Sequence, residues 1–175
     1  HLVPLLRKDE IEKGAEDLLL QYCPTALTDY KEHNAYLLAD KMGLHVEHLP
    51  LFHQQGTLSI LFFCVGTVQV ADDRQKSAYV SKVNIPAGTI VINTNAVHKD
   101  CCQMEIYHEC IHYAWHYMFF RLQDMHNSDI NKLRTKHVVI TNGKVPANPL
   151  KWMEWQARRG SFGLMMPLGL MRSQI

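Results

Sequence analysis

The stretch from Glu105 to Leu122 contains no glycine or proline, and apolar side chains are spread over most faces of the helix that it would form. A helix that is apolar nearly all round is buried in the core of a protein. The same stretch carries the pattern HECIH at positions 108–112. Two histidines and a glutamate are costly to bury without partners. Any fold of this chain must therefore supply partners for three polar groups on a buried helix.

The HECIH pattern predicts a metal site. Residues four apart lie on one face of a helix, so His108 and His112 can reach one Zn²⁺ ion. Glu109 would then lie beside the open position of the metal, where it can take a proton from water whose pKa the metal lowers to about 7. Glu109 is therefore the candidate general base. The alternative is that the histidines lie on the surface, or are core residues with single hydrogen bonds and no metal.

A third metal ligand is available in the segment PLKWMEWQARRGSFGLMMP, at positions 149–167. The segment predicts a second helix that stops at Pro167, and it offers Glu154. Two histidines and one glutamate, with water in the fourth place, form an open catalytic zinc site. The apolar face of this helix is expected to consist of Trp152, Trp155 and Leu164.

Two further polar residues of the first helix need an assignment. His116 continues the i, i+4 series, but its separation from His108 is about 12 Å along a straight helix, so the two cannot bind one ion. We expect His116 to touch a ligand or to line the pocket, with an ordinary packed histidine as the alternative. Glu105 lies one turn before His108 and is expected to be a solvated charge at the N-terminus of the helix.

The two segments together resemble the ImmA/IrrE family of metallopeptidases. The resemblance rests on a metal-binding helix with a further histidine four residues on, here HECIHYAWH, and on a later E-x-Q-A segment that runs into L-M-P, here MEWQARRGSFGLMMP. The stretch VNIPAGTIVINTN is similar to the family's strand pair before the active-site helix, so the likeness extends from about Tyr36 onward. The resemblance implies His108, His112 and Glu154 as zinc ligands and Glu109 as the general base.

The resemblance also implies a fold and an activity. It implies a compact zincin-like domain of the α+β class and a zinc-dependent endopeptidase that cleaves a regulatory protein, such as a transcriptional repressor. An extended peptide would bind in a groove beside the edge strand next to the metal helix. The oxyanion of the reaction needs one more hydrogen-bond donor. Four residues have the right chemistry, with packing as the alternative role of each: Tyr107, Tyr113, Tyr117 and His116.

A departure from the family motivates two alternative functions. After the E-x-x-A the family usually has Asn, at a position that would help to hold the active-site helix, and here the chain has Arg158. Gly160 and Gly163 stand in a helix that is normally rich in alanine, and each costs about 1 kcal/mol of helix stability relative to Ala. The alternatives are a catalytically impaired zinc-binding sensory domain and a protein-interaction domain that binds a peptide without cutting it.

Composition limits the class of protein. A chain of 175 residues with 47% hydrophobic and 20% charged residues can bury one core, so we expect a single domain over residues 1–175. A net charge of +1 does not favour direct binding to nucleic acid or a membrane surface. No apolar run would span a bilayer, and no secretory signal is expected. The five cysteines contain no C-x-x-C pair, which favours reduced thiols in the cytoplasm, with Cys101 and Cys102 packed and not metal-bound.

The rest of the sequence predicts short helices and strands around the metal helix. Asp9 is a plausible N-cap for the first helix, and Gly43 is a plausible end for the second. Asn142-Gly143 is typical of the turn of a β-hairpin. The expected elements are helices at 9–21 and 30–42, strands at 44–49 and within 58–70 and 79–92, turns at 71–74 and 86–88, and a hairpin over 137–145.

Overall fold

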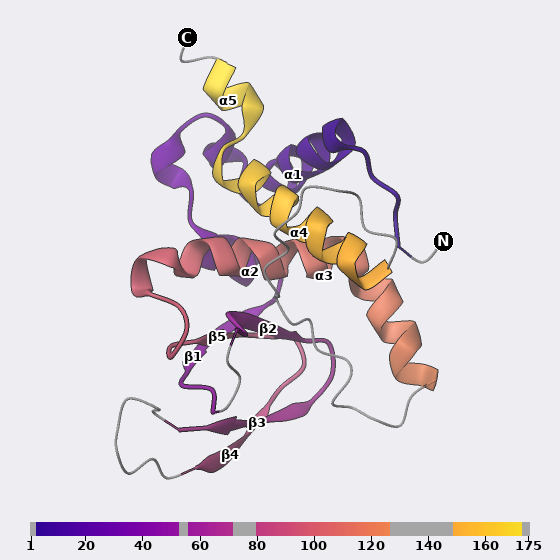
Figure 1. The fold of residues 1–175 in the computed structure, drawn as a ribbon. Helices are drawn as coiled ribbons and strands as arrows, with labels where there is room; N and C mark the ends of the chain where they lie inside the picture. Colours follow the sequence, from indigo (N-terminus) through magenta and orange to yellow (C-terminus); the bar gives the residue numbers. More distant parts are fainter. Residues whose placement is uncertain (1–2, 53–55, 72–79, 127–148, 173–175) are drawn as a thin grey trace.

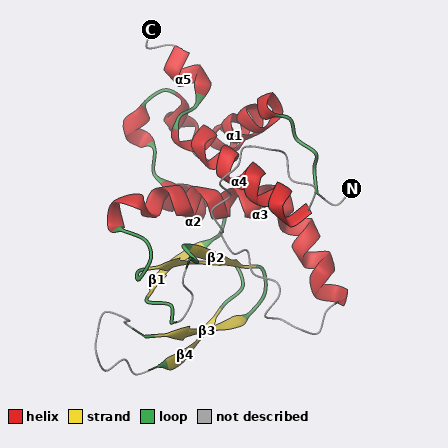
Figure 2. Ribbon diagram, in the orientation of Figure 1, coloured by secondary structure: helices red, strands yellow, loops and turns green. Residues whose placement is uncertain are grey.

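A computed structural model of the chain describes residues 3–52, 56–71, 80–126 and 149–172. The structure is of the mixed α+β kind, as predicted. Figure 1 shows α3 across the middle of the molecule, with α1, α4 and α5 on one side of it and the strands on the other. Figure 2 shows the same separation of helices from strands. The elements are α1 (Lys8–Tyr22), the 3-10 turns η1 (Pro24–Leu27) and η2 (Tyr30–Glu32), α2 (Ala35–Lys41), β1 (His45–Leu49), β2 (Ser59–Phe62), β3 (Gly66–Val70), β4 (Ser81–Ile85), β5 (Thr89–Asn93), η3 (Lys99–Cys101), α3 (Cys102–His126), α4 (Pro149–Met165) and α5 (Leu168–Arg172). The helix α4 ends before Pro167, as predicted.

The strands form two small sheets. β5 is the central strand of the first sheet, parallel to β1 and antiparallel to β2, while β3 and β4 form an antiparallel pair. Successive side chains of a strand point to opposite faces. Ile90 and Ile92 therefore join the core that contains the helices, whereas Val91 packs in a second core with Ile85 of β4. Because both faces are covered, β5 is buried along its whole length.

The two long predicted strand regions are each divided. The region 58–70 breaks at a bend over residues 63–65 into β2 and β3, and the region 79–92 breaks at the predicted turn into β4 and β5. The bend lets β3 leave the first sheet and pair with β4. In the turn, Gly88 takes a φ of 78°, a conformation that favours glycine. Residues 72–74 of the other predicted turn and the hairpin around Asn142-Gly143 lie outside the described residues.

The first helix begins one residue earlier than predicted. α1 starts at Lys8, and Asp9 lies in its first turn instead of at the N-cap. The carboxylate of Glu10 accepts a hydrogen bond of 2.7 Å from the N–H of Arg7, which satisfies one donor at this end of the helix. The N-cap residue is Arg7, so the prediction placed the cap two residues too late.

The second helix is shorter than the predicted range 30–42. Only Ala35–Lys41 is α-helical, because Asn34 begins a new helix with its side chain. Its Oδ1 accepts hydrogen bonds from the N–H groups of Tyr36 and Leu37, at 3.0 and 3.2 Å. The prediction that Gly43 follows the helix is confirmed, with a φ of 76°.

The helix α3 is the centre of the structure. It begins at Cys102, about one turn before the predicted start, and all residues from Glu105 to His112 are buried. Burial on several faces requires neighbours on several sides, and α2, α4, β2 and β5 all pack against this helix. Within the described ranges, no helix combines the length and the apolar character that a bilayer crossing needs.

The face that α4 turns to the core differs from the prediction. Met153 and Ala157 are buried together with Leu164, of which only Leu164 was expected. Trp152 and Trp155 are half-buried and stack on each other, with ring centroids 4.8 Å apart. The small side chain of Ala157 suits this face, because α4 packs against both α1 and α3.

The two glycines of α4 have a packing role that the sequence did not indicate. A Cβ atom on Gly160 would lie 2.9 Å from Ile111 Cδ1 of α3, and one on Gly163 would lie 2.9 Å from Ala15 Cβ of α1. Real Cβ atoms do not approach other carbons so closely. The glycines therefore permit the close approach of α4 to its neighbours, which offsets their cost to the helix.

We expect the substitution Gly163→Ala to destabilise the protein by about 1 kcal/mol. Overpacking against Ala15, whose methyl group cannot rotate away, costs about 1–3 kcal/mol, and better helix propensity returns about 1 kcal/mol. Gly169→Ala is a matched control in α5, because its new Cβ would lie 3.5 Å from the nearest atom, a normal contact. Urea denaturation of both variants measures the difference. A Gly163→Ala variant as stable as the wild type would contradict the packing role.

Candidate metal centre

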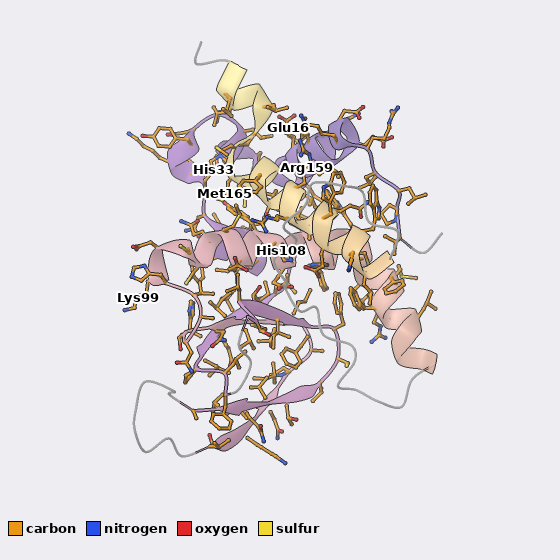
Figure 3. All side chains as sticks on the ribbon, in the orientation of Figure 1. Glu16, His33, Lys99, His108, Arg159 and Met165 are labelled. Atoms are coloured by element: carbon orange, nitrogen blue, oxygen red, sulfur yellow. The ribbon has the colours of Figure 1, made fainter. Side chains whose placement is uncertain are left out.

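The three side chains predicted as metal ligands meet where α3 and α4 pack together. His108 and His112 lie one turn apart on α3, and their Nε2 atoms are 3.0 Å apart. Glu154 extends from α4, with Oε1 3.2 Å from His112 Nε2 and Oε2 3.3 Å from His108 Nε2. Figure 3 labels His108 near the crossing of the two helices. The three ligand atoms form a compact triangle that could hold a metal ion.

The environment of the triangle fits a cation. The side chains of His108, His112 and Glu154 are 1%, 0% and 15% exposed. Among the described residues, Glu154 Oε2 is a buried oxygen that forms no hydrogen bond, although His108 Nε2 lies 3.3 Å from it. Burial raises the pKa of Glu154, but the facing imidazoles of His112 and His108 outweigh this and hold it below the usual value. A buried carboxylate that lacks a donor is costly, and a metal ion would satisfy it.

The candidate general base, Glu109, is held by the strand β2. Ser59 has the same parity in β2 as Leu61, whose side chain lies in the core with the helices, so Ser59 faces α3. Its hydroxyl donates to Glu109 Oε1 at 2.6 Å, and Glu109 is fully buried. The hydrogen bond therefore fixes the carboxyl group of Glu109 against β2.

The prediction for Glu105 is wrong. It is 6% exposed and is not a solvated charge at the start of the helix. Its Oε2 lies 3.3 Å from Ser59 Oγ, the same hydroxyl that binds Glu109. Glu105 does lie in the first turn of α3, but it lies on the face that packs against β2, where Ser59 contacts it.

The residue His116 touches a ligand, as predicted. Its Nδ1 is 3.0 Å from Nδ1 of His112, and its Nε2 is 2.9 Å from Oε1 of Gln156 on α4. Burial lowers the pKa of His116 to about 3, helped by the neighbouring His112, although the bond to Gln156 opposes the shift. His116 is therefore a neutral imidazole, and it lies on the side of His112 opposite to the Nε2 that faces Glu154.

The described contacts of the three candidate tyrosines are packing contacts, and those of His116 are hydrogen bonds to His112 and Gln156. Tyr107 is buried in the main core, where burial raises the pKa of its hydroxyl above the usual value. The rings of Tyr113 and Tyr117 pack against each other with centroids 5.3 Å apart. His116 contacts the far nitrogen of His112. The structure thus does not bring any of the four onto the ligand atoms through its described contacts.

Arg158 stands where the sequence departs from the ImmA/IrrE pattern. The side chain of Arg158 is exposed, and its backbone carbonyl accepts a hydrogen bond of 2.7 Å from Ser161. The described hydrogen bond from this part of α4 to α3 is made instead by Gln156, through His116.

The cysteines do not contribute to the candidate site. Among the described residues, none of the five forms a disulfide bond. Cys101 is exposed and its neighbour Cys102 is buried, so the pair does not point to one place. Cys110 lies within the HECIH pattern but is fully buried, and burial raises the pKa of its thiol.

No family model, curated protein or solved structure matches this chain.

Two residues of the site could not be predicted from the sequence. Ser59 is an ordinary serine in a strand, and no local pattern marks it. Gln156 stands within the E-x-Q-A segment, two residues after Glu154, but its contact with His116 depends on how α4 crosses α3. Both became visible only in the folded chain.

Proposed function

We propose that the protein is a zinc-dependent endopeptidase of the ImmA/IrrE type. The observation that carries the proposal is the triangle of His108, His112 and Glu154. Glu109 follows His108 directly in α3, and Ser59 holds its carboxyl group at 2.6 Å. A metal site of two imidazoles and one carboxylate next to a positioned base is the arrangement used in hydrolysis of peptide bonds.

Zinc is the metal that the donor set favours. It binds imidazole nitrogen and carboxylate oxygen at about 2.0–2.2 Å, and a tetrahedral arrangement then puts two ligand atoms roughly 3.3 Å apart. The two Nε2 atoms of His108 and His112 are 3.0 Å apart, and each lies within 3.3 Å of one of the two carboxylate oxygens of Glu154. The agreement supports binding through these atoms without a large rearrangement.

The residues divide the chemistry among them. A zinc ion supplies Lewis acidity toward the scissile carbonyl and makes a water molecule more acidic. Glu109 accepts the proton from the attacking water and then delivers it to the departing amine. The hydroxyl of Ser59 holds the carboxyl group of Glu109 in place, so the base does not have to be ordered during the reaction.

The proposed substrate is a regulatory protein, such as a transcriptional repressor, and the proposed location is the cytoplasm. The support for the substrate is the resemblance of the segments HECIHYAWH and MEWQARRGSFGLMMP to the ImmA/IrrE family. The free thiols support a reducing compartment. We propose no direct binding to nucleic acid.

A second candidate function is a zinc-binding sensory or protein-interaction domain. The burial of the site favours it, because His108, Glu109 and His112 are at most 1% exposed. A catalytic metal keeps one position open to water and substrate, whereas a structural metal is closed. For the endopeptidase to work, a substrate must reach this buried triangle.

Zinc reconstitution separates the two functions. Protein treated with a chelator should cleave no member of a peptide library, and one equivalent of zinc should restore cleavage, because the metal provides the Lewis acid. Mass spectrometry of the products identifies the cut, and elemental analysis gives the bound metal. Protein that binds one equivalent of zinc but cleaves neither the library nor a genuine partner would support the sensory or interaction domain. Restoration by iron(II) but not by zinc would contradict the proposed metal.

A further inference from the structure

A continuous path of hydrogen bonds leads from the N-terminal segment to His112. The carbonyl oxygen of Pro4 lies 2.6 Å from Nε2 of Gln156, and Oε1 of Gln156 lies 2.9 Å from Nε2 of His116. Nδ1 of His116 then lies 3.0 Å from Nδ1 of His112. We propose that Gln156, anchored by Pro4, is a positioning residue that sets the tautomer of His112 and presents its Nε2 lone pair to the metal. The inference rests on metal binding at the proposed site, but not on catalysis.

The direction of the path is set by the carbonyl group of Pro4. A carbonyl oxygen can only accept a hydrogen bond, so the amide nitrogen of Gln156 must face it and donate. The amide oxygen of Gln156 is then turned toward His116. The two ends of an amide are otherwise hard to distinguish, and here the fixed acceptor of Pro4 decides between them.

The amide oxygen of Gln156 fixes the proton of His116. It can only accept, so Nε2 of His116 must carry a hydrogen. His116 is fully buried, so a second proton would place a charged imidazole in the core. Its Nδ1 faces His112 and not a carboxylate that could balance the charge. His116 is therefore neutral, and its Nδ1 accepts.

The acceptor on His116 fixes the proton of His112 in turn. Nδ1 of His112 donates to Nδ1 of His116, so in the neutral ring, which is the form that binds a metal, the lone pair is on Nε2. That atom lies 3.2 Å from Glu154 Oε1 and 3.0 Å from His108 Nε2. A metal-bound histidine needs this tautomer, because only an unprotonated nitrogen can be a ligand.

The substitution Gln156→Met tests the inference. Methionine is similar in length but lacks the strong donor and acceptor, so it would release both His116 and Pro4. We expect the affinity for zinc to fall by about 10–100-fold, as for other groups that orient a metal-bound histidine. Competition with a chromophoric chelator on the purified chain measures this affinity, with zinc alone as the probe.

Trp152→Phe is the matched control. The indole Nε1 of Trp152 donates to the same Pro4 carbonyl at 3.3 Å, but the described contacts of Trp152 do not include His116. If Gln156 only packs the N-terminal segment, both variants should lose affinity equally, which would overturn the inference. If Gln156 sets the tautomer, Trp152→Phe should keep the affinity of the wild type.

Nitrogen-15 NMR of the histidine rings in the wild type tests the tautomers without any substitution. We expect a proton on Nε2 of His116 and on Nδ1 of His112, with and without zinc. A proton on Nδ1 of His116 would overturn the inference, even if Gln156→Met proved unable to fold. Wild-type protein that binds no zinc would count against the proposed function, and the NMR spectra of the metal-free protein would still decide the tautomers.

Discussion

The variant Glu109→Gln is expected to keep its zinc and to cleave substrate at least about 100-fold more slowly than the wild type. Glutamine has nearly the same size, and its amide oxygen can still accept the hydrogen bond that Ser59 donates to Glu109 at 2.6 Å. The candidate ligands His108 and His112 are unchanged. The substitution therefore removes only the proton acceptor. Initial rates and zinc content, measured on the same preparation, check both parts of the expectation.

Glu105→Gln provides a matched control for this variant. It makes the same chemical change one turn earlier on α3. Oε2 of Glu105 lies 3.3 Å from the hydroxyl oxygen of Ser59, the same hydroxyl that binds Glu109. Because Glu105 has no proposed part in proton transfer, we expect its variant to retain most of the wild-type rate. Equal losses in both variants would show that the hydrogen bonds around Ser59 limit the rate, and would contradict the role of Glu109 as general base.

The variant His112→Ala is expected to lose stoichiometric zinc. His112 Nε2 lies within 3.2 Å of a candidate ligand atom of both His108 and Glu154. The substitution removes this nitrogen and leaves only His108 and Glu154 as ligands. A single histidine and a carboxylate hold zinc far more weakly than three ligands. Elemental analysis after dialysis measures the metal. Since the ligands join α3 to α4, the variant should also melt at the same lower temperature as the metal-free wild type.

His45→Ala is the control for His112→Ala, because His45 is an exposed histidine on β1 and should leave zinc binding intact. Full zinc occupancy in His112→Ala would contradict the assignment of the ligands. A second comparison distinguishes a ligand from a residue that orients one. Glu154→Ala should bind zinc much more weakly than His116→Ala, for which a loss of about 10–100-fold is expected. The reverse order would mean that the third ligand is misplaced.

Most helices and strands could be predicted from local patterns, but several of their starts could not. The helix around His108 follows from a long stretch without glycine or proline, and Gly43 marks the end of α2 because its backbone needs a positive φ. The start of α2 depends on Asn34, which accepts from two N–H groups and divides one predicted helix into a 3-10 turn and an α-helix. Such competition between neighbouring caps is small in energy, and composition does not reveal it.

The candidate ligands could also be predicted, whereas the residues that support them could not. His108 and His112 are brought together by the pitch of one helix, which is a local property. Ser59 reaches Glu109 across 50 residues of chain, and Gln156 reaches His116 across 40. Contacts at these separations depend on the packing of β2 and α4 onto α3, for which the sequence carries no local pattern.

By itself the sequence determined a buried helix that carries two histidines and a glutamate, a second helix that carries Glu154, and a mixed α+β class. The reason is that helical spacing and the cost of burying polar groups are local properties. Tertiary structure alone decided that Glu105 is buried and that Gly160 and Gly163 permit close packing of α4. It also decided that a hydrogen-bond path from Pro4 ends at His112. The physical reason is that these features depend on how elements far apart in the chain cross one another.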